Sequence, residues 1–272
     1  GYDKNLAVGT ICAGGSLGTM IPPSIVLIIY GLTANVPIGD LFIATIVPGF
    51  LLAMLYLTYI LVRCGINPTL GPPAPLEERQ MPFLQKLALF KDLILPLTVA
   101  AWVLGSIYGG IASISEAAGM GVVGTLIAGL VRKELNWRVV RESALQTMNT
   151  CGMLLWLTFG ATALIGVYNL LGGTTFVKSV VMGLEMAPIG VILIMMGILV
   201  VMGLFMDWVG ILLLTVPIFV PVIVSLGYDP VWFGVLFCMN MQVSYLSPPF
   251  GPAAFYLKGV APPDISLQDI FA

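Results

Sequence analysis

Long apolar stretches alternate with short polar ones along most of the chain. Four stretches come close to the roughly 20 apolar residues with which a helix crosses about 30 Å of hydrocarbon: residues 40–63, 92–111, 116–131 and 148–171. Two further apolar regions, 4–34 and 187–227, are interrupted. Backbone polar groups inside lipid must be paired, and a helix pairs them within one segment. The pattern therefore predicts an all-α integral membrane protein.

Basic residues gather in two of the polar stretches and suggest an orientation. Eight of the eleven Lys and Arg residues lie in 63–92 and 132–142. Because basic loops stay in the cytoplasm, both stretches are predicted to lie there, and 40–63 then runs inward. The crossings 92–111 and 116–131 form an out-and-back pair with its turn at 109–115 outside, while 4–34 and 148–171 run outward.

Two stretches next to the crossings are amphipathic. Residues 136–147 are predicted to lie at the membrane interface, before the crossing at 148–171. The proline-rich stretch 71–79 is predicted to be a solvated loop, and the alternative is an extended linker that leads into an amphipathic helix near 82–91.

Composition narrows the class of protein. The chain of 272 residues is 59% hydrophobic and 9% charged, and its mean hydropathy is +1.05, which is more apolar surface than a soluble domain hides. A net charge of -2 provides no basic face, so we expect no nucleic-acid partner. The chain has no histidine, and its four cysteines have no metal-ligand spacing, which argues against an enzyme and against a cofactor.

The two ends of the chain resemble each other. A shift of 226 residues aligns 1–30 with 227–256 without a gap and with seven identities, which include the Pro-Pro pairs Pro22–Pro23 and Pro248–Pro249. The likeness continues when 40–42 is compared with 269–271. Internal repeats with interrupted helices at corresponding positions are typical of secondary transporters, whose binding sites lie at the interruptions.

Each Pro-Pro pair is expected to break its helix, near Met20 in the first copy and near Leu246 in the second. The glycine-rich run 14–18 adds backbone freedom before the first break. Carbonyl groups freed there must line a protein or water-filled cavity, where a cation suits them, and the restarting helix offers its positive end to an anion. The alternative is two plain proline kinks, but their equivalent positions favour a shared function.

The apolar run 187–227 has Asp207 near its middle. It is either two crossings or one re-entrant hairpin, 188–226, whose tip lies at membrane depth. A hairpin leaves four crossings between the broken helices, so that the copies run in opposite directions, and two crossings make them parallel. We predict the hairpin, because inverted repeats are a frequent transporter design, although arms of about 16 to 18 residues nearly span a bilayer.

Several polar residues within these apolar regions have two interpretations. Asp207 is either an ion-binding group in the transport path or an N-cap that bonds amides near Val209 or Gly210. Ser113 and Glu116 have the spacing of a capping box and are assigned a structural role. The amides of Asn149, Asn169, Asn240 and Gln242 are first expected to form hydrogen bonds between helices.

Several short motifs follow one another in a characteristic order: GGSLGTMIPPS at 14–24, SEAA at 115–118, MD at 206–207 with PIFVP at 217–221, and FGV at 233–235 before SPPFG at 247–251. With these motifs the chain resembles, over essentially its whole length, the large membrane subunit of tripartite ATP-independent periplasmic (TRAP) transporters, in the ion transporter superfamily. The resemblance implies an inverted-repeat, elevator-type symporter of the bacterial inner membrane that imports organic acids with sodium as coupling ion. It also implies two partners, a periplasmic solute-binding protein and a small four-helix membrane subunit.

The resemblance also implies site residues. It places one sodium site partly at the first break, around Gly14, Gly15, Ser16, Pro22 and Pro23. It places a second, partly formed by backbone, between the hairpin tip and the second break, with the candidates Asp207, Gly210, Ser247, Pro248 and Gly251. Solute candidates are Ser24, Asn240, Gln242 and Phe250. The approach to the second break is more polar than the family pattern at Gln242, Ser244 and Tyr245, which leaves the solute class open.

The expected domain organisation follows the repeat. Residues 1–34 and 188–272 form the transport part, and 35–187 form the scaffold and connecting helices. The family's first hairpin is expected before Gly1 and a further helix after Asp269, so the chain is expected to be a fragment with an incomplete first sodium site. The alternative functions are a sodium or proton symporter that needs no binding protein, and, from another class, an intramembrane enzyme or a membrane scaffold.

Overall fold

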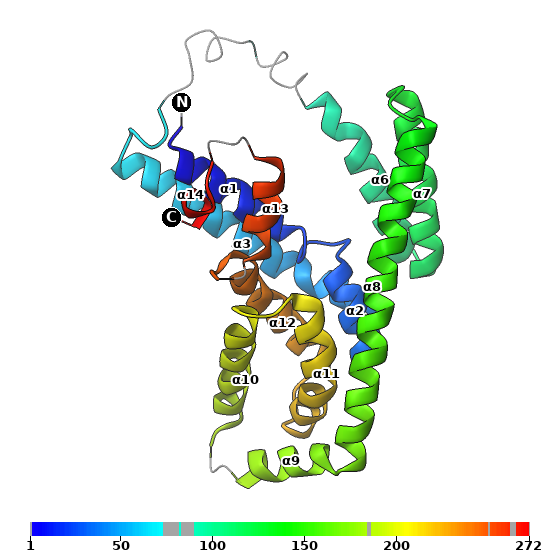
Figure 1. The fold of residues 1–272 in the computed structure, drawn as a ribbon, viewed down its shortest axis with the longest axis vertical. Helices are drawn as coiled ribbons and strands as arrows, with labels where there is room; N and C mark the ends of the chain where they lie inside the picture. The colour runs from blue at the N-terminus through cyan, green and yellow to red at the C-terminus, as the bar shows by residue number, and fades with distance from the viewer. Residues whose placement is uncertain are drawn as a thin grey trace. The chain divides into compact units, whose positions relative to one another are not determined.

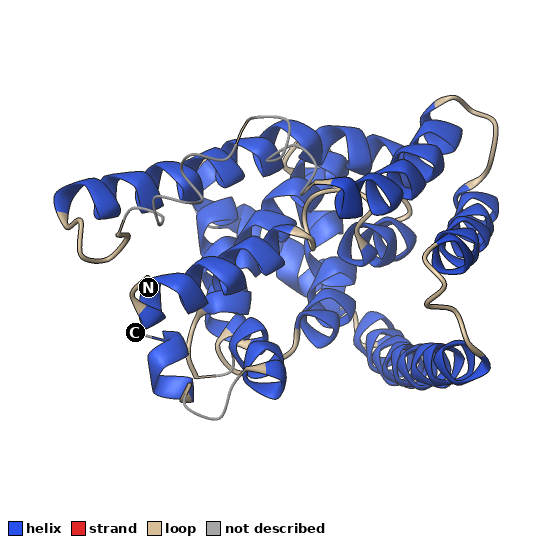
Figure 2. Cartoon of the chain, turned by 90° about the horizontal axis from the view of Figure 1, so that it is seen from above, coloured by secondary structure: helices blue, strands red, loops and turns tan. Residues whose placement is uncertain are grey.

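The computed structural model describes residues 2–72, 82, 90–183, 186–249, 251–261 and 265–271. Every regular element in these ranges is a helix (Figure 2). The chain forms two compact units. The first comprises Gly1–Gly71 and Met153–Ala272, and the second comprises Pro72–Gly152.

The first unit contains both broken helices, as the repeat predicts (Figure 1). The first copy consists of α1 (Lys4–Leu17) and α2 (Ile25–Ala34), and the second of α12 (Pro230–Leu246) and α13 (Pro252–Val260). Polar side chains cap both copies, since Asp3 accepts a hydrogen bond from the Leu6 amide at 3.0 Å and Asp229 accepts one from the Val231 amide at 2.6 Å.

Contacts between the two copies follow a reversed order along the chain. Cys12 lies against the carbonyl of Ala253 (3.7 Å), Thr19 against Gln242 (2.8 Å), and the Tyr30 hydroxyl donates to the carbonyl of Pro230 (2.7 Å). Early residues of the first copy thus meet late residues of the second. As predicted, the copies run in opposite directions.

The hairpin consists of α10 (Pro188–Gly203) and α11 (Trp208–Ser225), which contact each other and α12. The Asn240 amide donates to the Met196 carbonyl (2.8 Å), and Gly203, at the end of α10, meets the side chain of Ser244. Helices α10 and α12 are therefore parallel, and the hairpin tip lies level with the second break. By length and composition alone α11 could also cross a membrane, whereas α10 is shorter.

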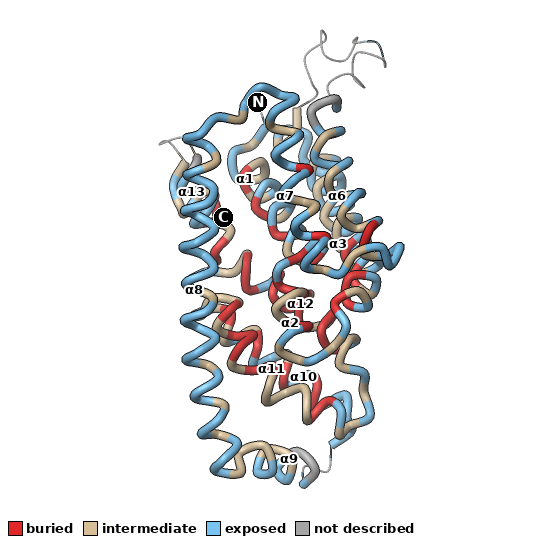
Figure 3. Tube along the Cα trace, turned by 90° about the vertical axis from the view of Figure 1, so that its right-hand side faces the viewer, coloured by how far each residue is buried: buried red, intermediate tan, exposed pale blue. Residues whose placement is uncertain are grey.

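Helices α3, α14 and α9 complete this unit. α3 (Ile38–Ile66) packs against α1, α2 and α12, and α14 (Leu267–Phe271) packs against α1 and α13. Buried residues concentrate along α2, α11 and α12 (Figure 3), with Tyr30, Phe42, Phe233 and Phe237 among the largest fully buried side chains. α9 (Gly173–Gly183) lies in a stretch to which the sequence pattern assigned no helix.

The second unit contains α6 (Lys91–Tyr108) and α7 (Ile114–Val131), which pack as an antiparallel pair. A Cβ atom at Gly124 would lie 3.3 Å from Val99, so the small residue permits close approach. The predicted capping box is confirmed, because Ser113 accepts from the Glu116 amide (3.4 Å) and Glu116 accepts from the Ser113 amide (2.7 Å). The linker at 71–79 and the helix near 82–91 fall largely outside the described residues.

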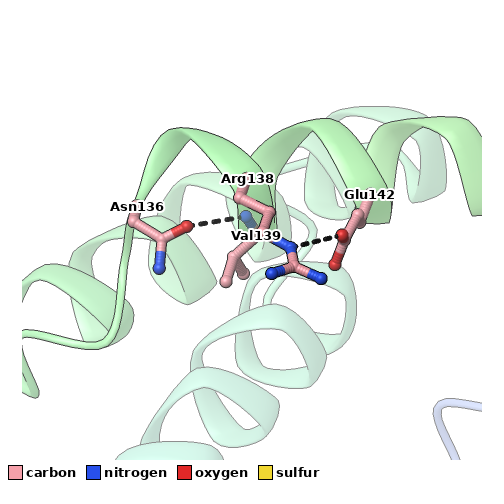
Figure 4. Close-up of polar contacts among 4 residues, drawn as sticks. All are labelled: Asn136, Arg138, Val139 and Glu142. Atoms are coloured by element: carbon pink, nitrogen blue, oxygen red, sulfur yellow. Dashed lines mark hydrogen bonds and ion pairs between the residues drawn. The ribbon is translucent and has the colours of Figure 1, made fainter.

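α8 (Trp137–Leu170) joins the predicted interfacial segment and the predicted crossing into one helix of 34 residues. The helix continues because no Gly or Pro interrupts 137–151, and the interfacial location of 136–147 stays a prediction. Asn136 caps the helix by accepting from the Val139 amide at 2.9 Å, and Arg138 pairs with Glu142 at 2.7 Å (Figure 4). At 1.5 Å per residue the helix is about 51 Å long, more than the roughly 30 Å of hydrocarbon.

The helices that are long and apolar enough to cross a membrane coincide with most of the predicted crossings. The four described helices that are long and apolar enough to cross are α3, α7, α8 and α11. The predicted crossing 92–111 is represented by α6, whose apolar part, Leu93–Tyr108, is shorter than a full span.

Close packing of the copies generates a stability prediction. A Cβ atom at Gly234 would lie 2.6 Å from the Tyr30 ring and 2.8 Å from Leu41. We expect Gly234→Ala to destabilise the protein by about 1–3 kcal/mol through overpacking, measured as thermal unfolding in detergent. Gly197→Ala is the control, because nothing lies within 4 Å of its added Cβ. Equal melting temperatures for the two variants would contradict this packing.

Candidate functional site

The first break, Gly18–Ser24, begins where α1 ends at Leu17. Pro22 and Pro23 lack the amides that would bond the carbonyls of Gly18 and Thr19 in a continuing helix. The Thr19 carbonyl accepts from the Ser24 hydroxyl instead. Among the described residues, the Gly18, Met20 and Pro22 carbonyls accept no hydrogen bond, so the break presents unpaired oxygens. Met20 is buried, Pro22 is half-buried and Gly18 is exposed.

The serines predicted for the first site shape the break. The Ser16 hydroxyl donates to the Ala13 carbonyl (2.8 Å) and interacts with Tyr56 of α3. Ser24 accepts from the Leu27 amide (3.5 Å) and so caps α2. Gly14 and Gly15 lie inside α1, one turn before the break. Their role as ion ligands stays a prediction.

The second break, Ser247–Gly251, is held by short backbone bonds. The Ser247 amide donates to Val243 and the Gly251 amide donates to Ser247, each at 2.9 Å. Pro248 and Pro249 lack amides, so Ser244 and Tyr245 at the end of α12 lose the usual partners of their carbonyl groups.

Gly251 is required at this break. Its φ is +26°, and a Cβ atom there would lie 2.6 Å from the Phe271 ring, so a side chain is excluded twice. Phe250, a predicted solute residue, lies outside the described residues.

The hairpin tip brings a carboxylate to the second break. Asp207 Oδ2 accepts from the Val209 amide (3.1 Å), which confirms the N-cap interpretation, and Gly210 lies in the first turn of α11. The phenol of Tyr245 lies within range of the Asp207 charge. The second Asp207 oxygen accepts no hydrogen bond from the described residues, so it is available to a ligand.

Helix α12 carries three buried polar side chains, Asn240, Gln242 and Ser244, each at most 5% exposed. Each has one oxygen without a hydrogen-bond partner among the described residues, namely Asn240 Oδ1, Gln242 Oε1 and Ser244 Oγ. An unpaired buried polar atom costs about 1–3 kcal/mol. The three side chains face different neighbours, because Asn240 and Ser244 contact α10 and Gln242 contacts the first break.

Thr19 is the residue of the site that the sequence analysis missed. Its hydroxyl donates to the Ser16 carbonyl (2.8 Å) and accepts from Gln242 Nε2 (2.8 Å). The available signal was its position, since it is the one hydroxyl residue between Gly18 and the Pro-Pro pair.

The potential ligands at the two breaks are oxygen atoms. The described residues contain no group of three or more His, Cys, Asp or Glu side chains that could hold a metal ion. Carbonyl, amide and hydroxyl oxygens with one carboxylate suit a hard cation. Two oppositely directed broken helices and a hairpin tip, enclosed in apolar helices, define a multi-pass membrane permease.

Comparison with known sequences also identifies a membrane permease. Residues 1–271 match the tripartite ATP-independent periplasmic transporter, DctM component. The chain belongs to this family of permeases, and with its apolar helices it is a multi-pass protein of the bacterial inner membrane.

Individual relatives are similar over nearly the whole chain. The isethionate TRAP transporter permease protein DctMQ of Oleidesulfovibrio alaskensis is 30% identical over 262 residues, which are 96% of this chain and 40% of the relative. The C4-dicarboxylate TRAP transporter large permease protein DctM of Vibrio cholerae is 28% identical over 285 residues, covering 96% and 61%. The sialic acid TRAP transporter permease protein SiaT of Haemophilus influenzae is 29% identical over 269 residues, covering 98% and 42%. The chain thus spans less than two thirds of each of these relatives.

The contact between the hairpin and α12 can be tested by enlarging Gly203 and then shortening Ser244, which lies against it. A Cβ atom at Gly203 would lie 1.7 Å from Ser244 Oγ and 2.5 Å from Ser244 Cβ, but 3.4 Å from the Ser244 backbone. We expect Gly203→Ala to destabilise the protein by about 1–3 kcal/mol, measured as thermal unfolding. Adding Ser244→Gly should cancel that loss, relative to Ser244→Gly alone. A double variant as unstable as the sum of the single variants would argue against this contact.

Proposed function

We propose that this chain is the membrane subunit of a sodium-coupled importer of organic acids that works with a periplasmic solute-binding protein and a small four-helix membrane subunit. The observation that carries the proposal is the pair of oppositely directed broken helices, which contact each other along their length, with Thr19 of the first break bonded to Gln242 on α12. Membership of the family supports it, and the relatives are named for isethionate, C4-dicarboxylate and sialic acid, all of which are organic acids.

Sodium is proposed to bind at two places. At the first break, neutral oxygens come from the carbonyl groups between Gly18 and Pro23 and from Ser16 at the end of α1. At the second, the free oxygen of Asp207 and the backbone between Ser247 and Gly251 surround the other ion. Unwound carbonyls bind coupling cations in this way in transporters with discontinuous helices.

The organic acid is proposed to bind near the same breaks. The N-terminal ends of α2, at Ser24, and of α13, at Gly251, direct free amides and the positive ends of the helix dipoles toward the interruptions. A carboxylate is attracted there without a basic side chain. Of the solute candidates, Ser24 lies within the first break and Gln242 bonds to it through Thr19.

Transport is proposed to follow an elevator mechanism in which the broken helices and the hairpin move together. The proposed moving part, 1–34 and 188–272, shares its apolar core across α2, α11 and α12. α3 packs closely against α1, α2 and α12 although it belongs to the proposed scaffold, so sliding must occur along this interface.

Reconstitution tests the proposal as a whole. The complete transporter in liposomes should accumulate an organic acid when an inward sodium gradient and the loaded solute-binding protein are both present. Uptake is measured with a radiolabelled acid, and potassium in place of sodium is the control. Uptake without the binding protein would favour a binding-protein-independent symporter, and uptake without a sodium gradient would contradict the coupling.

Asp207 provides a test of one ion site. Asparagine caps helices as well as aspartate does, so Asp207→Asn keeps the bond to Val209 but removes the charge. We expect the sodium concentration for half-maximal uptake to rise on the order of tenfold. Asp229→Asn is the matched control, because Asp229 caps α12 in the same way at the far end from the break. An Asp207→Asn variant with unchanged sodium dependence would leave Asp207 with the cap role alone.

A further inference from the structure

One side-chain hydrogen bond joins the two broken helices at the level of their breaks. Gln242 Nε2 donates to Thr19 Oγ1 at 2.8 Å, between residues 223 positions apart in the chain. Thr19 lies within the first break, and Gln242 lies on α12 just over one turn before Ser247, where the second break begins. The bond therefore connects a segment of irregular backbone in one copy to the helix that leads into the irregular backbone of the other.

Thr19 is placed so that this bond controls the shape of the first break. Its hydroxyl donates to the Ser16 carbonyl, and its own carbonyl accepts from the Ser24 hydroxyl. Both walls of the break, the end of α1 and the start of α2, are thus attached to Thr19. Displacing Thr19 would shift the neighbouring Gly18 and Met20 carbonyls, which have no hydrogen-bond donor among the described residues.

Packing alone does not explain the amide at position 242. Gln242 is 3% exposed, and its buried Oε1 has no hydrogen-bond partner in the part of the chain that the structure describes. A methionine would fill the same space and leave no unpaired acceptor, so the amide is unfavourable for stability except through its bond to Thr19. The unpaired oxygen also points to a ligand that binds beside the first break, since such a ligand would satisfy it.

We propose that Gln242 is a positioning residue that couples the two breaks, so that sodium binding at the first break and the state of α12 depend on each other. The inference rests on the proposed function. An ion that draws the break carbonyls together moves Thr19, and the bond carries this displacement to α12 and thus toward Ser247. By linkage, occupation of the second break then changes the affinity of the first by the same factor.

A double-mutant cycle on sodium binding tests the coupling. The complete purified transporter is titrated with sodium, and the rise of its melting temperature gives the half-saturating concentration and the Hill coefficient. Gln242→Met and Thr19→Val each remove the bond with little change in volume. We expect each to raise the half-saturating concentration about tenfold and to lower a Hill coefficient of about two toward one, and the double variant to match either single variant.

Two controls separate coupling from structural damage. Thr19→Ser keeps the hydroxyl and should retain the wild-type sodium response. Thr45→Val removes a buried hydroxyl whose bonds to described residues, the Leu41 and Phe42 carbonyls, lie within its own helix, and it should leave the sodium response unchanged.

The outcomes distinguish this inference from the proposed function. If sodium stabilises the wild type and Gln242→Met has the same half-saturating concentration and Hill coefficient as the wild type, the coupling is overturned and the proposed function stays intact. Additive effects of the two substitutions in the double variant lead to the same conclusion. A wild type that sodium does not stabilise more than potassium overturns the proposed function, and the coupling fails with it.

Discussion

The structure depends on one constraint, that a backbone polar group within lipid must find a partner inside the protein. Continuous helices such as α7 meet it by themselves, but the Pro-Pro pairs remove amides at four positions and leave carbonyls unpaired. Neighbouring helices contact the chain at or just before each break. Thr19 of the first break bonds to α12, and Ser244, three residues before the second break, contacts the end of α10. Unpaired oxygens, which would only destabilise a rigid scaffold, are the groups that we propose as ion ligands in this permease.

Helix α12 is the element around which the core is organised. It contacts α2 and α3 on one side, α10 and α11 on another, and α1 near its end. Its polar residues alternate between these neighbours, so that Asn240 and Ser244 fix the hairpin while Gln242 reaches the first break. A single helix thus contacts the parts of both proposed ion sites that this chain contains.

The sequence predicted the helical class, both breaks and the reversal of the copies, because prolines, repeat alignment and run length depend on local chemistry. The helix pair α10–α11 is present, and its re-entrant course in the membrane stays a prediction. It did not predict that α8 is continuous, because a change from polar to apolar residues does not end a helix when no Gly or Pro stands between. It overlooked Thr19, because a lone hydroxyl acquires its importance only from Gln242, which is distant in the chain. The different directions of Asn240 and Gln242 likewise required the packing of α10 and α1 around α12.

The bond between Gln242 and Thr19 has no mirror image. The shift of 226 residues that relates the copies pairs Gln242 with Ser16 and Thr19 with Tyr245. Among the described residues, Ser16 and Tyr245 form no hydrogen bond with each other, and Ser16 bonds to Ala13 within its own helix. In the proposed transporter, a core with exact twofold symmetry would give its inward- and outward-facing states equal energy. The one-sided bond is one of the differences between the two halves that would make these energies unequal, so it would help to set the side of the membrane on which the empty transporter rests.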